Sequence, residues 1–362
     1  EVNNKDEANG GTCRNEKDEA NDSEFRQDSF NGDLRDVKFA WNKLCFGPTF
    51  EKLKLAVFSK TWPIGAGPGG MERHASTIYH ALAARDHEIH VFTVPSDRKP
   101  HLDIHERNLH VYFAANDHGS VNCSLAFEIF NKINANGEFD YVHPESVSLP
   151  HWRAKMVPNV AVTWHGIWYE IMHSNNLKSY LQIKMGLCQA LAPMTELQEA
   201  MPRLIEEIRF FSFDKQHICI SNSAGEALVN VYQLPKRNVH VILNGVDHTK
   251  FVHDPEAGAR FRRRYGLPDN GSLACGRIRP LGKKPVLTLN YPSIVGTAVV
   301  KEEFGYTFSP NVKSFVDALE LTIRDGPKVM QKRGMACKEY ALTMYTATKM
   351  ASSYERPFSR DC

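Results

Sequence analysis

The sequence lacks several features that would assign it to a well-marked class of protein. No hydrophobic stretch approaches the roughly 18 residues of a membrane-spanning helix, and no secretory signal pattern opens the chain. The eight cysteines include no C-x-x-C pair, which excludes the usual spacing of a zinc finger. Lys and Arg number 44 and Asp and Glu number 42, so the net charge of +2 gives no sign of a nucleic-acid partner.

What the sequence does contain is the alternation of strands and helices that is typical of an α/β protein. Its 362 residues suffice for about two domains, and 42% of them are hydrophobic, an ordinary value for a globular chain. The first 38 residues are an exception, because they are rich in Asn, Asp, Glu and Gly. Such a stretch buries too little apolar surface to offset its ordering entropy, so we predict a disordered acidic and polar tail over 1–38.

Residues 39–245 are predicted to form a complete N-terminal doubly wound domain with a parallel sheet. A buried-type strand, a Gly-rich loop, a helix over 71–85 and a second strand make one βαβ unit. The alternation then continues, and the longest helical stretch, 177–211, is interrupted by Pro193 and Pro202. The candidate strands are 55–58, 87–93, 109–113, 139–143, 160–164, 217–220 and 239–243. The expected fold class is therefore α/β.

Residues 246–362 show fewer strand signals and are predicted to form an incomplete second Rossmann-like domain. A short helix over 261–268 ends at a Gly and a Pro, and strands are expected at 285–289 and 298–300. Two helices are expected at 312–324 and 326–354. These few strands fall short of the about five or six that a doubly wound sheet contains.

The Gly-rich loop after the first strand admits two interpretations. Gly65, Gly67 and Gly70 match the G-x-G-x-x-G dinucleotide fingerprint, which would make the chain an NAD-binding Rossmann protein. However, residues 59–63 separate the loop from its strand, and no acidic residue ends the second strand, where the fingerprint places one. The alternative is that Gly69 and Gly70 open the first helix, so that its free N–H groups can bind a phosphate or a developing oxyanion.

Four short motifs give the chain a resemblance to a known family. They are Pro68-Gly-Gly-Met-Glu-Arg-His74, Thr163-Trp-His-Gly166, Ile220-Ser-Asn-Ser223 and Val241-Ile-Leu-Asn-Gly-Val-Asp247. In this order they resemble the GT-B glycosyltransferases of the retaining group called family 4, and the run from Phe39 to Gly70 resembles plant members. The resemblance covers about residues 39–273 and resumes over 284–356.

The resemblance implies a transferase that moves a sugar from a nucleotide-sugar to an acceptor hydroxyl with retention of configuration. The nucleotide-sugar is then a co-substrate, and neither a metal nor another cofactor is expected. His165 directly follows a strand, at the edge where open α/β sheets bind ligands, and is the candidate catalytic residue beside the donor sugar. Gly69 and Gly70 are candidates for binding the donor phosphates.

Further candidate residues flank this centre. Glu72 lies in the first turn of the helix after the Gly-rich loop, where it either contacts substrate or stabilises the helix start. His143 and Glu145 end another strand and are assigned to the acceptor side. Arg277 and Lys283 are candidates for the Arg and Lys that contact the donor diphosphate in this family.

The sequence departs from the family in its second half. There the family uses two glutamates spaced E-x7-E to contact the ribose and the donor sugar, whereas no two glutamates after Asn244 are eight positions apart. A segment of the second domain is therefore expected to be missing. Two interpretations follow: a hexosyltransferase with an altered donor site, and a non-catalytic remnant or splice product that keeps only the acceptor-side domain.

The compartment is left open by the sequence. A chain with no membrane span is expected to be cytoplasmic as written. Because it opens with Glu1 rather than Met, an upstream anchor that placed the protein at the Golgi membrane is the alternative.

Overall fold

The computed structural model describes most of the chain after its first 50 residues. The described residues are 51–64, 69–184, 193–211, 215–247, 249, 255–266, 286–290 and 302–358. The predicted tail 1–38, Gly65, Gly67, Arg277, Lys283 and the expected strand 298–300 lie outside them. Among the described residues, no helix combines the length and the apolar character needed to cross a membrane.

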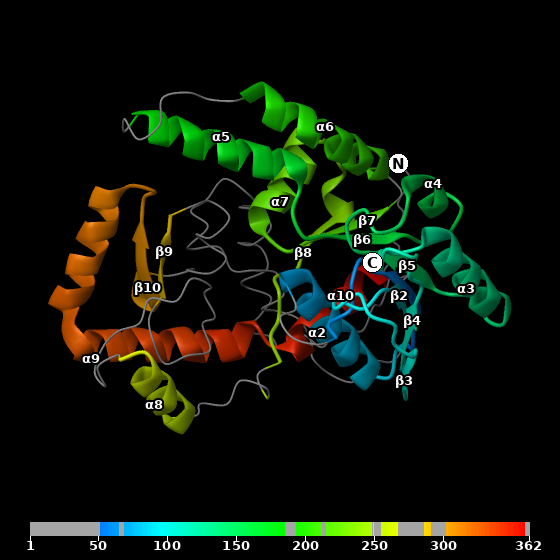
Figure 1. Ribbon diagram of the computed structural model, residues 1–362, viewed down its shortest axis with the longest axis horizontal. Helices are drawn as coiled ribbons and strands as arrows, with labels where there is room; N and C mark the ends of the chain where they lie inside the picture. Colours follow the sequence, from blue (N-terminus) through cyan, green and yellow to red (C-terminus); the bar gives the residue numbers. More distant parts are fainter. Residues whose placement is uncertain are drawn as a thin grey trace, which may run out of the picture.

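A parallel sheet with one antiparallel edge strand forms the core of the first half (Figure 1). Its hydrogen-bonded strands run in the orders β3-β4-β2-β1-β5 and β6-β7-β8, and two parallel bridges, Val142 to Val160 and Glu145 to Thr163, join β5 to β6. The strands are β1 (Lys54–Phe58), β2 (Glu88–Thr93), β3 (Ile104–Glu106), β4 (Leu109–Phe113), β5 (Tyr141–Pro144), β6 (Ala161–Trp164), β7 (Gln216–Cys219) and β8 (Val239–Val241). All the strands predicted up to residue 245 are confirmed, and only the short antiparallel β3 was not predicted.

The strand order reverses between β1 and β5. The chain builds outward from β1 through β2 and β4, returns to β5, and continues on the other side through β6, β7 and β8. At such a reversal the connections leave toward opposite faces, and a crevice opens outside the carboxyl ends of the two central strands. Ser59 and Glu145 directly follow β1 and β5, so both residues lie, buried, at this reversal of the strand order.

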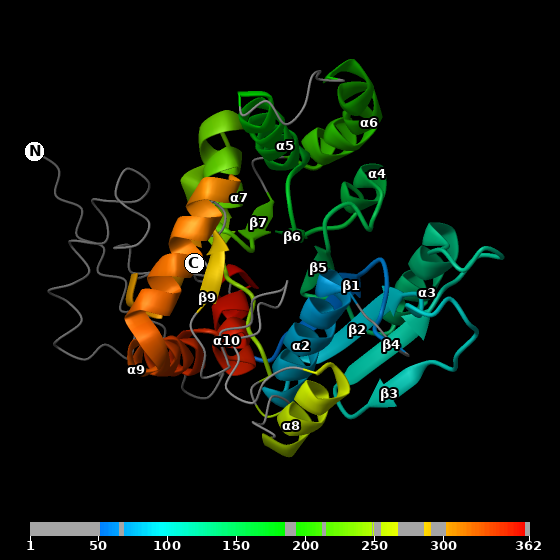
Figure 2. The same cartoon turned by 60° about the vertical axis from the view of Figure 1, so that its left-hand side comes forward.

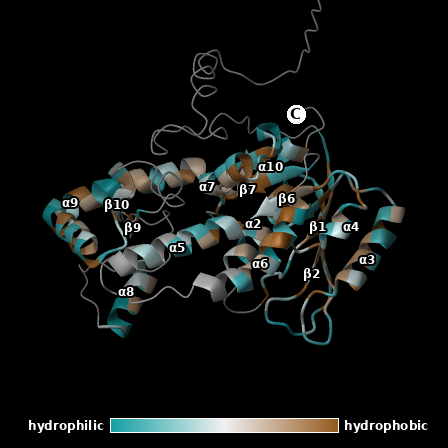
Figure 3. Cartoon of the chain, turned by 90° about the horizontal axis from the view of Figure 1, so that it is seen from above, coloured by the Kyte–Doolittle hydropathy of each residue, from teal (hydrophilic) through white to brown (hydrophobic). Residues whose placement is uncertain are grey.

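Helices cover both faces of the sheet because side chains alternate along each strand. Leu55 and Val57 of β1 belong to the hydrophobic cluster that includes residues of α2 and α10, whereas Phe58 packs with Phe130 of α3 on the other face. Figure 3 shows hydrophobic residues concentrated where α2, α10 and the central strands meet. The helices are α2 (Gly70–Ala84), α3 (Cys123–Ala135), α4 (His151–Ala154), α5 (Trp168–Lys184), α6 (Pro193–Phe210), α7 (Asn222–Glu226), α8 (Pro255–Arg264), α9 (Val312–Met344) and α10 (Ala347–Phe358).

The second half contributes a small parallel sheet and the long helix α9 in its described part. Strands β9 (Val286–Leu289) and β10 (Gly305–Phe308) pair in parallel, and α9 lies beside β10 (Figure 1). Helix α9 changes direction at Gly326, whose φ of 69° lies in the left-handed region that glycine tolerates. The incompleteness of this second domain stays a prediction.

Three helix predictions were wrong in their bounds. The short helix predicted over 261–268 begins earlier, as α8 at Pro255, and ends at Arg264. The stretch predicted over 177–211 begins earlier, as α5 at Trp168, and resumes as α6 at Pro193, and α6 runs through Pro202 without the predicted interruption.

The helix predicted over 326–354 breaks at Tyr345, because the backbone of Val246 pairs there with the backbone of Tyr345 and Ala347. The Val246 N–H donates to the Tyr345 carbonyl (2.8 Å), and the Ala347 N–H donates to the Val246 carbonyl (3.1 Å).

The two halves of the chain cross at this same point. Segment 244–247 runs beside segment 345–347, and Val246 and Thr346 form a parallel bridge. A Cβ atom on Gly245 would lie 2.6 Å from the Thr346 carbonyl oxygen, so only glycine allows this approach. The crossing returns the chain to the first half, where α10 packs against α2 (Figure 2).

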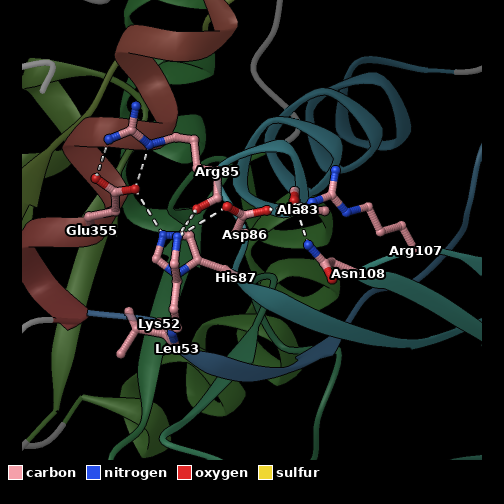
Figure 4. Close-up of polar contacts among 9 residues, drawn as sticks. All are labelled: Lys52, Leu53, Ala83, Arg85, Asp86, His87, Arg107, Asn108 and Glu355. Atoms are coloured by element: carbon pink, nitrogen blue, oxygen red, sulfur yellow. Dashed lines mark hydrogen bonds and ion pairs between the residues drawn. The ribbon is translucent and has the colours of Figure 1, made fainter. Parts of the chain in front are cut away.

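A partly buried ion pair fastens α10 to the first half (Figure 4). The Glu355 carboxylate accepts hydrogen bonds from Arg85 Nε (2.5 Å) and Nη2 (2.9 Å), and the two side chains are only 16% and 14% exposed. His87 Nδ1 accepts the Leu53 N–H at 3.1 Å, so its proton is on Nε2, which donates to Glu355 at 2.9 Å. One carboxylate therefore accepts hydrogen bonds from two residues of the first half, the buried His87 and the partly buried Arg85.

We predict that Glu355→Gln lowers the free energy of unfolding by about 1–3 kcal/mol, because it removes the charge that accepts hydrogen bonds from Arg85 and His87 in a partly buried site. Urea denaturation followed by circular dichroism measures the loss. The matched control is Glu128→Gln, which removes an exposed pair with Lys132 (2.9 Å) and should cost at most about 0.5 kcal/mol. Equal effects of the two substitutions would contradict the role of the partly buried pair.

Candidate functional site

Glu145 lies at the centre of a buried polar cluster at the crevice. Its side chain is 0% exposed, and three elements supply its partners. Ser59 Oγ, after β1, donates to Oε2 at 2.6 Å, and the Tyr79 hydroxyl, from α2, donates to Oε1 at 3.0 Å. His165 Nε2, after β6, lies 3.7 Å from Oε1. The carboxyl ends of three strands thus meet α2 at one carboxylate.

His165 is held beside this carboxylate with one ring nitrogen free of hydrogen bonds. Its side chain is 7% exposed, and its ring lies edge-on to His74 of α2, with centroids 4.7 Å apart. His165 Nε2 is buried and has no hydrogen-bond partner among the described residues. A buried imidazole nitrogen in this state can bind a ligand atom without first breaking a bond within the protein.

A chain of hydrogen bonds links the cluster to helix α10. The Tyr354 hydroxyl lies 3.2 Å from His74 Nε2 and 3.0 Å from Thr163 Oγ1, and Thr163 Oγ1 lies 3.0 Å from His143 Nε2. All four side chains are buried. The second half of the sequence therefore contributes a hydroxyl to a site otherwise built by the first half.

The cluster holds a negative charge beside the two neutral imidazoles of His74 and His143. Burial would raise the pKa of Glu145, but His165, His74 and the Ser59 hydroxyl lower it to about 2, so the carboxylate is ionised. Burial and the neighbouring His165 lower the pKa of His74 to about 3. Burial also lowers the pKa of His143 to about 4, although Glu145 opposes the shift. At neutral pH both of these histidines are uncharged.

The start of α2 provides a second feature. Gly69 is the N-cap residue, and no side chain caps the helix, so its first N–H groups can bind an anion. The Glu72 side chain lies beside this helix start. Its Oε1 accepts a hydrogen bond from Thr61 Oγ1 at 2.7 Å, and a Cβ atom on Gly69 would lie 2.5 Å from its Oε2. These contacts favour helix-start stabilisation as the role of Glu72.

The loop that carries His165 is held by α6. The Trp168 N–H, at the start of α5, donates to Glu207 Oε2 at 2.8 Å. Glu207 is 4% exposed, and burial raises its pKa to about 7 although the Trp168 N–H and the charge of Lys60 oppose the shift. Glu170, in the first turn of α5, accepts a hydrogen bond from Ser223 of α7.

The structure brings together some of the predicted site residues and separates others. His143, Glu145 and His165 lie in one cluster, although neither His143 nor Glu145 reaches the surface. Gly69, Gly70 and Glu72 lie at the start of α2, and Arg277 and Lys283 are outside the described residues. The roles assigned to all eight stay predictions.

Four residues of the cluster were missed by the sequence reasoning. His74 ends the first quoted motif, and Tyr79 follows it on α2, so the helical spacing held a signal for both. Ser59 directly follows the first strand. Tyr354 is 280 residues away from His74, and no pattern in the sequence connects them.

The fold defines the class of protein. Solved structures with the same arrangement include a glycosyltransferase from Rickettsia africae (12% identity, TM-score 0.55, 85% of this chain and 98% of that chain covered). Sucrose-phosphate synthase from Thermosynechococcus elongatus shares 14% identity at a TM-score of 0.61, with 84% and 98% covered. Anabaena HepE in complex with UDP-glucose shares 11% at 0.54, again with 84% and 98% covered. The chain has the GT-B glycosyltransferase fold.

The sequence itself narrows this class to a family. The profile of Glycosyltransferase Family 4 matches residues 68–250, which is just over half of the chain. The protein therefore belongs to glycosyltransferase family 4, as its motifs predicted. A comparison with curated protein sequences gives no match.

We predict that Glu207→Gln changes the pH dependence of stability. The folded-state pKa of about 7 lies above the ordinary 4.5, so the carboxyl contributes stability that is complete below pH 4.5 and is lost as the pH rises through 7. Glutamine keeps an acceptor for the Trp168 N–H and stays neutral. Relative to the wild type, the variant should therefore gain about 1–3 kcal/mol between pH 5 and pH 8. Urea denaturation at both pH values measures this, and a parallel change in the two proteins would contradict it.

Proposed function

We propose that this chain is a retaining sugar transferase that takes a nucleotide-sugar as donor and works at the crevice between β1 and β5. The observation that carries the proposal is the unpartnered His165 Nε2 beside the ionised Glu145 at this crevice. Membership of family 4 supports the reaction class. The bound UDP-glucose of the similarly folded Anabaena protein supports a nucleotide-sugar as the donor.

The residues of the first half then take complementary roles. The uncapped start of α2, at Gly69 and Gly70, stabilises the negative charge that develops on the leaving diphosphate. His165 hydrogen-bonds a hydroxyl of the donor sugar through Nε2. Glu145 does not contact the sugar; its Oε1 lies 3.7 Å from His165 Nε2 and orients the imidazole.

A second candidate is a binding protein without turnover. The absence of an E-x7-E pair after Asn244 favours it, because the family uses these glutamates to contact ribose and sugar. A protein of this kind has the same fold but does not bind the nucleotide-sugar donor. The two candidates therefore differ in whether a nucleoside diphosphate binds.

Thermal unfolding of the purified chain with UDP, GDP, ADP or NAD separates these functions. A ligand at about 100 times its dissociation constant adds about 2.7 kcal/mol, which raises the melting temperature by several degrees. We expect a saturable shift with one nucleoside diphosphate and none with NAD. A cooperative transition that no nucleotide shifts would assign the chain to the binding class, and a shift with NAD alone would make it a dinucleotide-binding protein.

We predict that His165→Ala lowers sugar transfer roughly ten- to a hundredfold, because one hydrogen bond to the donor sugar is lost. The thermal unfolding experiment identifies the nucleotide base that the chain binds. The rate is then measured as release of nucleoside diphosphate from a nucleotide-sugar with that base. His118→Ala, at an exposed turn residue, is the matched control and should leave the rate unchanged. Equal rates for the wild type and His165→Ala would remove His165 from the mechanism.

A further inference from the structure

Three side chains that commonly bind metal ions converge in the cluster at the crevice. One ligand atom from each of His74, Glu145 and His165 lies within 4.8 Å of the other two. His74 belongs to α2, whereas Glu145 and His165 directly follow β5 and β6. All are more than nine-tenths buried. We propose that these three residues form a binding site for Zn²⁺.

The donor set and its spacing suit this ion. Two imidazoles and one carboxylate, with a fourth position left for water or another ligand, are a common arrangement around zinc. Bonds of about 2.0–2.2 Å in a tetrahedral site place the ligand atoms about 3.3–3.5 Å apart. His165 Nε2 and Glu145 Oε1 are 3.7 Å apart, and all three ligand atoms lie within 4.8 Å of one another. Closing the site around an ion therefore requires the side chains to move together by about 1 Å.

Unpartnered nitrogen atoms point to a missing ligand. His165 Nε2 and His74 Nδ1 are both buried and make no hydrogen bond of ordinary geometry among the described residues. Their polar neighbours are Glu145, whose Oε1 lies 3.7 Å from His165 Nε2, and Asn244 beside His74. Two such atoms beside one buried carboxylate need an explanation, because buried polar atoms are nearly always paired. A cation bound by both nitrogens and by the carboxylate satisfies all three groups at once.

The surrounding hydrogen bonds are those that metal ligands usually have. Ser59 and Tyr79 already hold the carboxylate through its two oxygens. The Tyr354 hydroxyl can accept the proton of His74 Nε2 and donate its own toward Thr163, which leaves His74 Nδ1 as a bare lone pair. Partners of this kind fix the tautomer and the orientation of a ligating imidazole.

An ion at this site has a consequence for the proposed reaction. Zn²⁺ would occupy His165 Nε2, the atom assigned above to a sugar hydroxyl, so zinc and donor sugar would exclude one another. Zinc is then expected to inhibit transfer. This consequence rests on the proposed function, whereas the site itself does not.

The test uses the full chain after removal of metal by a chelator, with Co²⁺ as a coloured substitute for zinc. We expect saturable visible absorption of tetrahedral Co²⁺, its displacement by Zn²⁺, and a rise of several degrees in melting temperature with saturating zinc. His165→Ala should abolish all three. His118→Ala should retain them. A cooperative thermal unfolding transition of metal-free His165→Ala shows that this variant is folded. If it is not folded, His165→Gln is used in its place.

A competing site on the surface provides the second control. The paired strands β3 and β4 place His105 Nδ1 and His110 Nδ1 3.1 Å apart, close enough to chelate an ion at the surface. His105→Ala should therefore leave the Co²⁺ signal unchanged. A signal that survives in both His165 variants, or that is lost in His105→Ala, would overturn the proposal, as would no binding at all. The readouts need no nucleotide, so their failure would leave the transferase proposal standing.

Discussion

An ionised carboxylate that has no contact with water must be satisfied by its neighbours, and Glu145 imposes this requirement on several elements at once. It accepts hydrogen bonds from the hydroxyls of Ser59, after β1, and Tyr79, in α2, and it lies beside His165, after β6. The strands are already adjacent because of the sheet order, and the carboxylate fixes how their ends face one another. The crevice at the reversal of the sheet is therefore a rigid polar centre.

The second half of the chain completes this centre from a distance. Its last helix returns through the crossing at Gly245, packs on α2, and is fastened by the Glu355 carboxylate to Arg85 and His87. Tyr354, next to Glu355, then reaches His74 in the cluster. Neighbouring residues of α10 thus attach the second half to the first, through Glu355, and complete the polar cluster, through Tyr354.

Much of the fold was predictable because buried parallel strands are short apolar runs separated by helices. The clustering of His143, Glu145 and His165 followed from the same fact, since the carboxyl ends of neighbouring strands meet at one edge. The break at Tyr345 and the contribution of Tyr354 were not predictable. Both depend on pairing with Val246 and packing on α2, which are contacts between residues about a hundred or more positions apart. Local propensity favours a continuous helix there, and tertiary contacts override it.

The ionisation of Glu145 tests the central claim most directly. A titration of the side-chain carboxyl carbons by ¹³C nuclear magnetic resonance, with Glu145→Gln to assign the signal, follows this one group. The account predicts that Glu145 remains ionised down to about pH 4 and below, consistent with a pKa of about 2 that is set by His165, His74 and Ser59 against burial. A midpoint at or above the ordinary value of 4.5 would contradict it. The cluster would then be held by a neutral acid, and the orientation of His165 would need another explanation.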